Sequence, residues 1–252
     1  MTLNALPIIA WNNRILDATL TVSTEATGYP KENLYGLRPA VPWYGTGASE
    51  QTITLTFGSP TPASCVGISG HNLHTIGAAN VVLQYFDGSW KDCHAAWTPT
   101  NNRTWWMAFT ARNVTDYRLK IPAGYTAPPW IGVLFVGTYL TLPAWPSGDW
   151  DPDYEEAERN DNYSRDGHYM GNDVRYRNRK FVINIDYLSD AFVQASLIPW
   201  RDWAVGKPFF VIPERGNHPT AVYYMMTEPK FATPWNKNSR RVSIPFFGLR
   251  EP

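Results

Sequence analysis

The feature that most constrains the fold is a series of short strand-like segments within residues 1 to about 140. Each has either apolar residues alternating with polar ones or a continuous apolar run, and turn residues (Gly, Pro, Asn, Asp) stand between them. No amphipathic helix of convincing length interrupts the series, so the pattern predicts a β-sandwich. The clearest segments are residues 52–57, 81–86, 116–121 and 130–137.

The second of these segments is followed by Asp87-Gly88, a dipeptide that favours the tight turn of a β-hairpin. We therefore expect Ser89 and Trp90 to begin a returning strand.

The order of motifs in the first 140 residues resembles the discoidin-type domain, a jelly roll also called the coagulation factor 5/8 C-type or galactose-binding-like domain. The resemblance spans roughly residues 20 to 138, and the terminal disulfide typical of the family is missing. It implies the jelly-roll fold but no ligand, because the family's ligand-contacting loops vary too much to be carried over. The motifs are Asn33-Leu34-Tyr35, Pro39, Trp43, Phe57-Gly58, Pro62, Val66-Gly67-Ile68, His71-Asn72-Leu73, Tyr85 to Trp90 and Tyr117 to Ile121.

Residues 181–213 predict a strand, a helix and a second strand. Alternation over 181–186 favours the first strand. Ser189 or Asp190 is expected to cap a helix over about 189–205, which Pro199 kinks or restarts and Gly206 ends. The apolar run 209–212 is the second strand.

This arrangement, together with Gly206 to Glu214 and the closing segment Arg241 to Glu251, resembles the hub β-barrel of phage tail-tip proteins. Those are the distal tail and baseplate hub families of long-tailed phages. The resemblance covers roughly the last 110 residues and rests on pattern and order. It implies a tail-tube-like barrel with one flanking α-helix. We therefore expect two domains, 1–140 and 141–252.

Between these domains, residues 139–180 change character from proline-rich to acidic, then polar, then basic. We expect a long loop over 149–180. One hypothesis is that acidic residues of one copy pair with basic residues of the next; the alternative is two solvated faces on a mobile arm. The assembly-interface candidates are Asp149, Asp151, Asp153, Glu155, Glu156, Arg175, Arg177, Arg179 and Lys180.

Composition narrows the function classes. The 252 residues carry no net charge, so a general nucleic-acid surface is not expected. Cys65 and Cys93 form no metal-binding CxxC pair, and we expect a reduced, buried pair. The N-terminal residues have neither a charged leader nor a long apolar run, so no signal peptide or membrane insertion is expected.

No catalytic motif is visible. There is no nucleophile elbow, phosphate loop or dinucleotide fingerprint. His71 and His74 have the spacing of a metal pair, with His94 or Asp92 as a third ligand, but exposed turn residues are the expected reading. The acidic run leaves a glycosidase carboxylate pair as an alternative. We expect no enzyme, no metal and no cofactor.

The aromatic excess of 12 Trp and 14 Tyr suits buried interfaces. Because neighbouring strand residues point to opposite faces, one member of Trp105-Trp106 is expected in the core. An exposed aromatic pair would more often make an assembly contact than a glycan site. The glycan- or partner-binding candidates are Trp43, Tyr44, Trp105 and Trp106.

From these observations we expect a mainly β structural protein of a phage tail tip or baseplate, located in the virion. Its hub barrels would form a homo-oligomeric ring that joins the tail tube to the tip and docks neighbouring tail, fibre or tip proteins. The alternative is a carbohydrate-binding module or adhesin that recognises host surface glycan.

Overall fold

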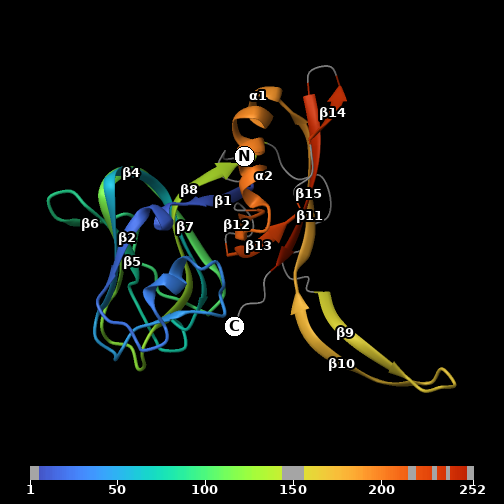
Figure 1. The fold of residues 1–252 in the computed structure, drawn as a ribbon, viewed down its shortest axis with the longest axis horizontal. Coiled ribbons are helices and arrows are strands. Elements are labelled where there is room, and N and C mark those ends of the chain that lie inside the picture. Colours follow the sequence, from blue (N-terminus) through green and yellow to red (C-terminus); the bar gives the residue numbers. More distant parts are fainter. Residues whose placement is uncertain (1–5, 144–155, 215–219, 229–231, 237–238, 249–252) are drawn as a thin grey trace. The chain divides into compact units, whose positions relative to one another are not determined.

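The computed structural model describes residues 6–143, 156–214, 220–228, 232–236 and 239–248. Contacts within the chain divide it into one compact unit, Ile8–Thr141, and a second formed by Leu142–Arg250 with Met1–Pro7. Both units are built mainly from antiparallel strands (Figure 1), so the expectation of a mainly β chain is confirmed.

The first unit is a β-sandwich whose sheet runs in the order β1-β8-β4-β7-β5-β6, with β2 paired to β4 and β3 to β8. Short 3-10 helices, η2 (Arg14–Asp17) and η3 (Lys31–Tyr35), lie between its early strands. The strands are β1 (Ile8–Asn13), β2 (Ala18–Val22), β3 (Trp43–Tyr44), β4 (Gln51–His71), β5 (Val82–Phe86), β6 (Trp90–Asp92), β7 (Trp105–Ile121) and β8 (Trp130–Thr141).

Strand β4 organises this unit because it pairs with both β7 and β8. Its register against β7 shifts between Thr56 and Thr61 and again between Ala63 and Cys65, so successive segments of β4 pair in different registers. Ile53, Leu55 and Phe57 alternate into the core, as the sequence predicted. The hairpin expected at Asp87-Gly88 is also present, between β5 and β6.

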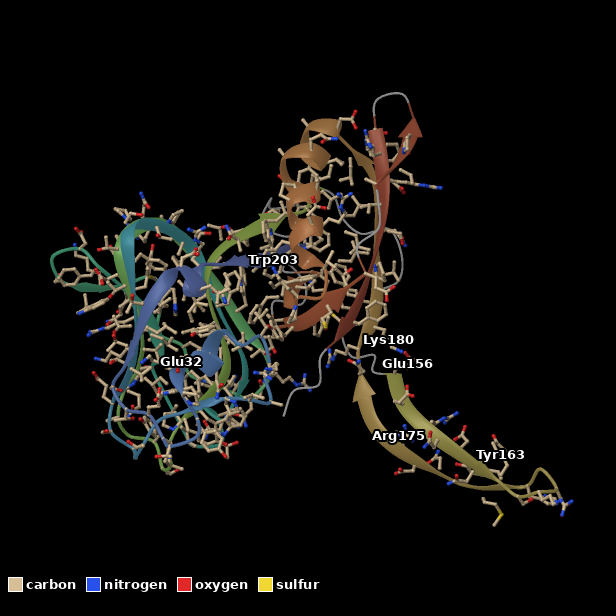
Figure 2. All side chains as sticks on the ribbon, viewed as in Figure 1. Glu32, Glu156, Tyr163, Arg175, Lys180 and Trp203 are labelled. Carbon is tan, nitrogen blue, oxygen red and sulfur yellow. The ribbon has the colours of Figure 1, made fainter. Side chains whose placement is uncertain are left out.

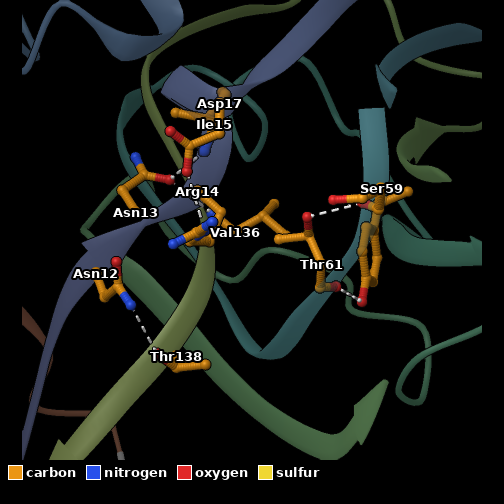
Figure 3. A network of polar contacts seen from close by, with 10 residues as sticks. Asn12, Asn13, Arg14, Ile15, Asp17, Ser59, Thr61, Val136 and Thr138 are labelled. Atoms are coloured by element: carbon orange, nitrogen blue, oxygen red, sulfur yellow. Dashed lines mark hydrogen bonds and ion pairs between the residues drawn. The ribbon is translucent and has the colours of Figure 1, made fainter. Parts of the chain in front are cut away.

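A polar side chain fixes the first strand onto the sandwich (Figure 3). Asn13 Oδ1 accepts from the Ile15 N–H at 3.2 Å, which caps η2, and from the Val136 N–H at 3.1 Å. Its Nδ2 donates to Leu134 O at 3.0 Å. One asparagine thus satisfies backbone groups on η2 and on β8, where an unpaired buried group would be costly.

The second unit contains a sheet in the order β11-β15-β13-β12, with β14 paired to β15, and a separate two-stranded sheet of β9 and β10. Its described strands form an open sheet, and no ladder among them closes it into the expected hub barrel. The elements are β9 (Glu156–Tyr163), β10 (Tyr169–Asn178), β11 (Lys180–Leu188), α1 (Asp190–Phe192), the π-helical turn η4 (Val193–Leu197), α2 (Ile198–Ala204), β12 (Phe209–Ile212), β13 (Tyr223–Thr227), β14 (Thr233–Asn236) and β15 (Ser239–Gly248).

The helical segment follows its sequence signals. Ser189 Oγ accepts from the Phe192 N–H at 3.2 Å, which is the expected N-cap. The π turn gives way to α2 at Ile198, next to Pro199, which supplies no N–H. Gly206 follows α2 with a φ of +68°, as a helix end favours. In the described part of the chain no helix has the length and apolarity needed to cross a membrane.

Residues 149–180 were expected to form a long loop, but their described part contains two paired strands. The segment from Glu156 to Asn178 is the antiparallel pair β9–β10, which we call the arm (Figure 1). Strands form here although the segment is polar, because each strand satisfies the other's backbone groups.

Candidate functional site

Three partly exposed aromatic residues meet at the end of the sandwich where β8 begins. We call Tyr29, Tyr44 and Trp130 the aromatic patch. The ring centroids of Tyr29 and Tyr44 are 4.4 Å apart, and those of Tyr44 and Trp130 are 6.0 Å apart. Tyr29 is 45% exposed, and the other two are half-buried. The patch therefore offers solvent a continuous aromatic surface rather than isolated rings.

Backbone pairing holds these rings in place. Tyr44 lies opposite Trp130 in the β3–β8 ladder, and the Tyr44 N–H donates to Tyr29 O at 3.4 Å. The Asn72 side chain accepts from the Trp130 N–H at 2.8 Å and donates to Pro128 O at 3.0 Å. Because the supports are strands and satisfied hydrogen bonds, the patch is preorganised, and the protein would lose little conformational entropy when a ligand binds.

The surroundings of Tyr44 favour its neutral phenol. Burial, and then the neighbouring Tyr29, raise the pKa of Tyr44 above its usual value. A protonated phenol both donates and accepts a hydrogen bond. The patch thus combines apolar ring faces with polar hydroxyls, which suits a ligand that has an apolar face and hydroxyl edges.

Two of the four aromatic candidates from the sequence are core residues. Trp43 is fully buried, and its Nε1–H donates to Thr24 O at 3.2 Å. Trp106 is buried against Tyr139, with ring centroids 5.5 Å apart. Neither ring face is open to a ligand, so both leave the candidate site. Tyr44 stays in it, and Tyr29 and Trp130, which were not singled out from the sequence, are added.

Trp105 lies in a second aromatic group, where its ring stacks on Trp97 at 4.1 Å with planes 11° apart. The two rings pack against the sandwich core and are half-buried. Trp97 is brought there by a bridge between its backbone and Val81. This stack covers the rim of the core, so the aromatic patch is the better candidate for ligand contact.

Two histidines flank this stack, and burial lowers the pKa of both. The ring of His71 stands edge-on to Trp97 at 5.8 Å, and the ring of His94 lies 5.7 Å from Trp105. Each ring bonds to the backbone through both nitrogens, so both have structural roles. Among the residues that the structure describes, no three His, Cys, Asp or Glu side chains gather to hold a metal.

Both cysteines are buried and free, and burial raises the pKa of the Cys93 thiol to about 12. A thiol with a raised pKa is a poor nucleophile. These cysteines therefore behave as core residues.

The charged candidates fall at the arm and its base. Glu156 pairs with Lys180 within the same chain at 2.9 Å. The Arg175 guanidinium lies 2.7 Å from the Asn160 side-chain amide, and Arg179 stands 4.8 Å over the Tyr223 ring. Arg177 is an exposed residue of β10. The remaining four candidates, Asp149, Asp151, Asp153 and Glu155, lie outside the described residues.

Comparison with known proteins gives similar solved structures only. No family model matches this sequence, and no curated protein matches it. One similar structure is a chitosan-binding module in complex with chitotriose, from a chitosanase/glucanase of Paenibacillus sp. IK-5. It is 20% identical with a TM-score of 0.42, covering 50% of this chain and 100% of its own.

Two other solved structures are also similar to this chain. A pectin-binding carbohydrate-binding module is 14% identical with a TM-score of 0.40, covering 48% of this chain and 89% of its own. A protein described as a putative α-L-fucosidase from Bacteroides thetaiotaomicron is 18% identical with a TM-score of 0.44. That match covers 52% of this chain and 29% of the other.

Proposed function

We propose that the first unit is a carbohydrate-binding module that uses the aromatic patch. The observation that carries this proposal is the contact of three partly exposed rings on a hydrogen-bonded support. An aromatic face carries partial negative charge, so it attracts the slightly positive C–H face of a sugar ring. The phenol groups of Tyr29 and Tyr44 then bond sugar hydroxyls. The reaction class is binding without turnover.

The test is a glycan array with the full chain, followed by calorimetry with the best glycan and with chitotriose. Trp130→Ala and Tyr44→Ala are each expected to weaken binding roughly fivefold, since one aromatic contact contributes on the order of 1 kcal/mol. Trp90→Ala is the matched control, because Trp90 is also a half-buried tryptophan but packs on Phe86 and Arg118 of another surface.

Absence of binding to any glycan at millimolar concentration would contradict the proposal. A loss with Trp105→Ala but not with Trp130→Ala would also contradict it, because the site would then be the Trp97–Trp105 stack.

A second candidate function is assembly into a phage tail tip, favoured by the exposed arm of the second unit and by the hub resemblance of the sequence. In this role copies of the chain form a ring in the virion and dock other tail proteins. The two functions are compatible, since the module and the arm belong to different units.

A further inference from the structure

The arm is a two-stranded sheet with little cover. All eight residues of β9 are exposed, and in the described part of the chain β9 and β10 pair only with each other. Figure 2 shows side chains standing free along both strands. A lone hairpin is at best marginally stable in water. A surface that covers the arm would therefore stabilise it.

The cross-strand register places three of the arm's exposed apolar side chains on one face, because directly opposite residues share a face. Tyr163, Tyr169 and Val174 on this face are 62%, 56% and 47% exposed. Two arginines accompany them, and Asp161 pairs with one, Arg159, at 3.5 Å. We call this the apolar-basic face. Its register pairs are Tyr163–Tyr169, Asp161–Asn172, Arg159–Val174 and Ala157–Arg177.

The opposite face carries more acidic than basic charge. Glu158 on β9 and Asp173 on β10 supply its negative charge, the Arg175 guanidinium lies beside Asn160 of this face, and Glu156 pairs with Lys180. Near the tip it presents Asn162 opposite Gly171, and no atom lies within 4 Å of where a Gly171 Cβ would stand. This open position can accept a ring from another molecule. We call this surface the acidic face.

The geometry points to a second copy of this chain as the partner: the apolar-basic face of one arm packs on the acidic face of the next. Arg159 and Arg177 then meet Glu158 and Asp173, and the tyrosine rings lie over Gly171. Packing two apolar-basic faces together is disfavoured, because it brings like-charged arginines against each other. This inference rests on the second candidate function, assembly into a ring, and identifies the arm of a neighbouring copy as the surface that each arm contacts.

The area of one arm face is too small for a stable dimer but is sufficient for a ring in which every arm makes two contacts. A strand of eight residues is about 27 Å long and a hairpin about 10 Å wide, so one face offers on the order of 300 Å². That is below the roughly 800 Å² per partner of a stable interface. Each arm, however, has one face of each kind, so every copy holds two neighbours, and a closed ring strengthens each contact through the others.

The experiment uses sedimentation velocity of the full chain over a range of concentrations. Arg159→Glu/Arg177→Glu makes both faces acidic, and Glu158→Arg/Asp173→Arg makes both faces basic. Each double variant is expected to associate at least tenfold more weakly than the wild type. An equimolar mixture of the two is expected to restore association, because every contact again joins opposite charges. Thermal melts of each variant check that folding is unchanged.

The outcomes separate the inference from the assembly candidate. If the wild type associates and both variants associate equally well, the arm pairing is overturned while assembly stands. If only the arginine variant fails, two apolar-basic faces meet and the proposed pairing is wrong. A wild type that stays monomeric at every concentration overturns both.

Discussion

Gly132→Ala is expected to destabilise the first unit by about 3 kcal/mol and to lower its melting temperature by roughly 10 °C. Gly132 lies in β8, and a Cβ there would fall 2.7 Å from the backbone C and Cα of Pro39 and closer still to its carbonyl oxygen. Gly70 of the adjacent strand β4 faces the same proline. Backbone atoms cannot rotate away, so the Pro39 segment has to lift off the strands.

Gly58→Ala is the matched control. Gly58 also lies in a long strand of this unit, but no atom stands within 4 Å of its Cβ position. Its melting temperature is expected to stay within about 2 °C of the wild type. If differential scanning calorimetry shows the same small change for Gly132→Ala, Pro39 does not pack on β8 as described.

Strands could be predicted where burial of a face requires apolar residues at regular positions in the sequence, and the helix could be predicted from the residues that mark its ends. Residues 52–57 alternate because one side of β4 faces the core, and Phe209–Ile212 is fully apolar because β12 is buried throughout. Ser189 and Gly206 mark the helix ends through backbone chemistry that is local in sequence. Such signals need no knowledge of distant residues.

The strands of the arm, in contrast, could not be predicted from the sequence. They bury none of the β9 side chains, so no apolar periodicity marks them, and a loop was expected. The sequence did show the charge blocks, but not that Glu156 would pair with Lys180 inside one chain. That pairing depends on the hairpin register, which is set by the two strands together.

The candidate site was only partly predictable, because side-chain exposure depends on contacts between distant segments. Alternation showed that one of Trp105 and Trp106 faces the core, but not which one. Trp43 and Tyr44 are neighbours, yet one is core and the other belongs to the patch. Trp130 was overlooked because it opens an apolar strand; its position after Pro128-Pro129, at a strand end, was the available signal.

Acidification is expected to destabilise the first unit through His71, which is 2% exposed at the end of β4. Its Nδ1 accepts from the Leu73 N–H at 3.3 Å, and its Nε2 lies 3.0 Å from Arg103 O, so the neutral ring carries its proton on Nε2. A second proton would set Nδ1–H against the Leu73 N–H. Burial accordingly lowers the pKa of His71 to about 4.

The direction of the pH effect follows from this lowered pKa. Between pH 6.5 and about 4 the unfolded chain binds a proton at His71 that the folded chain does not. The stabilising contribution is therefore complete above pH 6.5 and is lost as the pH falls to about 4. The loss is on the order of 3 kcal/mol, at about 1.4 kcal/mol for each pKa unit. Burial lowers the pKa of His94 as well, which adds a loss in the same direction.

The measurement is urea unfolding of the full chain between pH 4 and 8, followed by tryptophan fluorescence. His71→Asn keeps an acceptor near Nδ1 but does not titrate, so its unfolding free energy should fall by about 3 kcal/mol less than that of the wild type across this range. At pH 7 the variant should be about 1 kcal/mol less stable, because the bond to Arg103 O is lost. His168→Gln, at an exposed position between the arm strands, is the control and should follow the wild type. Parallel pH profiles for His71→Asn and the wild type would show that the buried imidazole is not the group that titrates on unfolding.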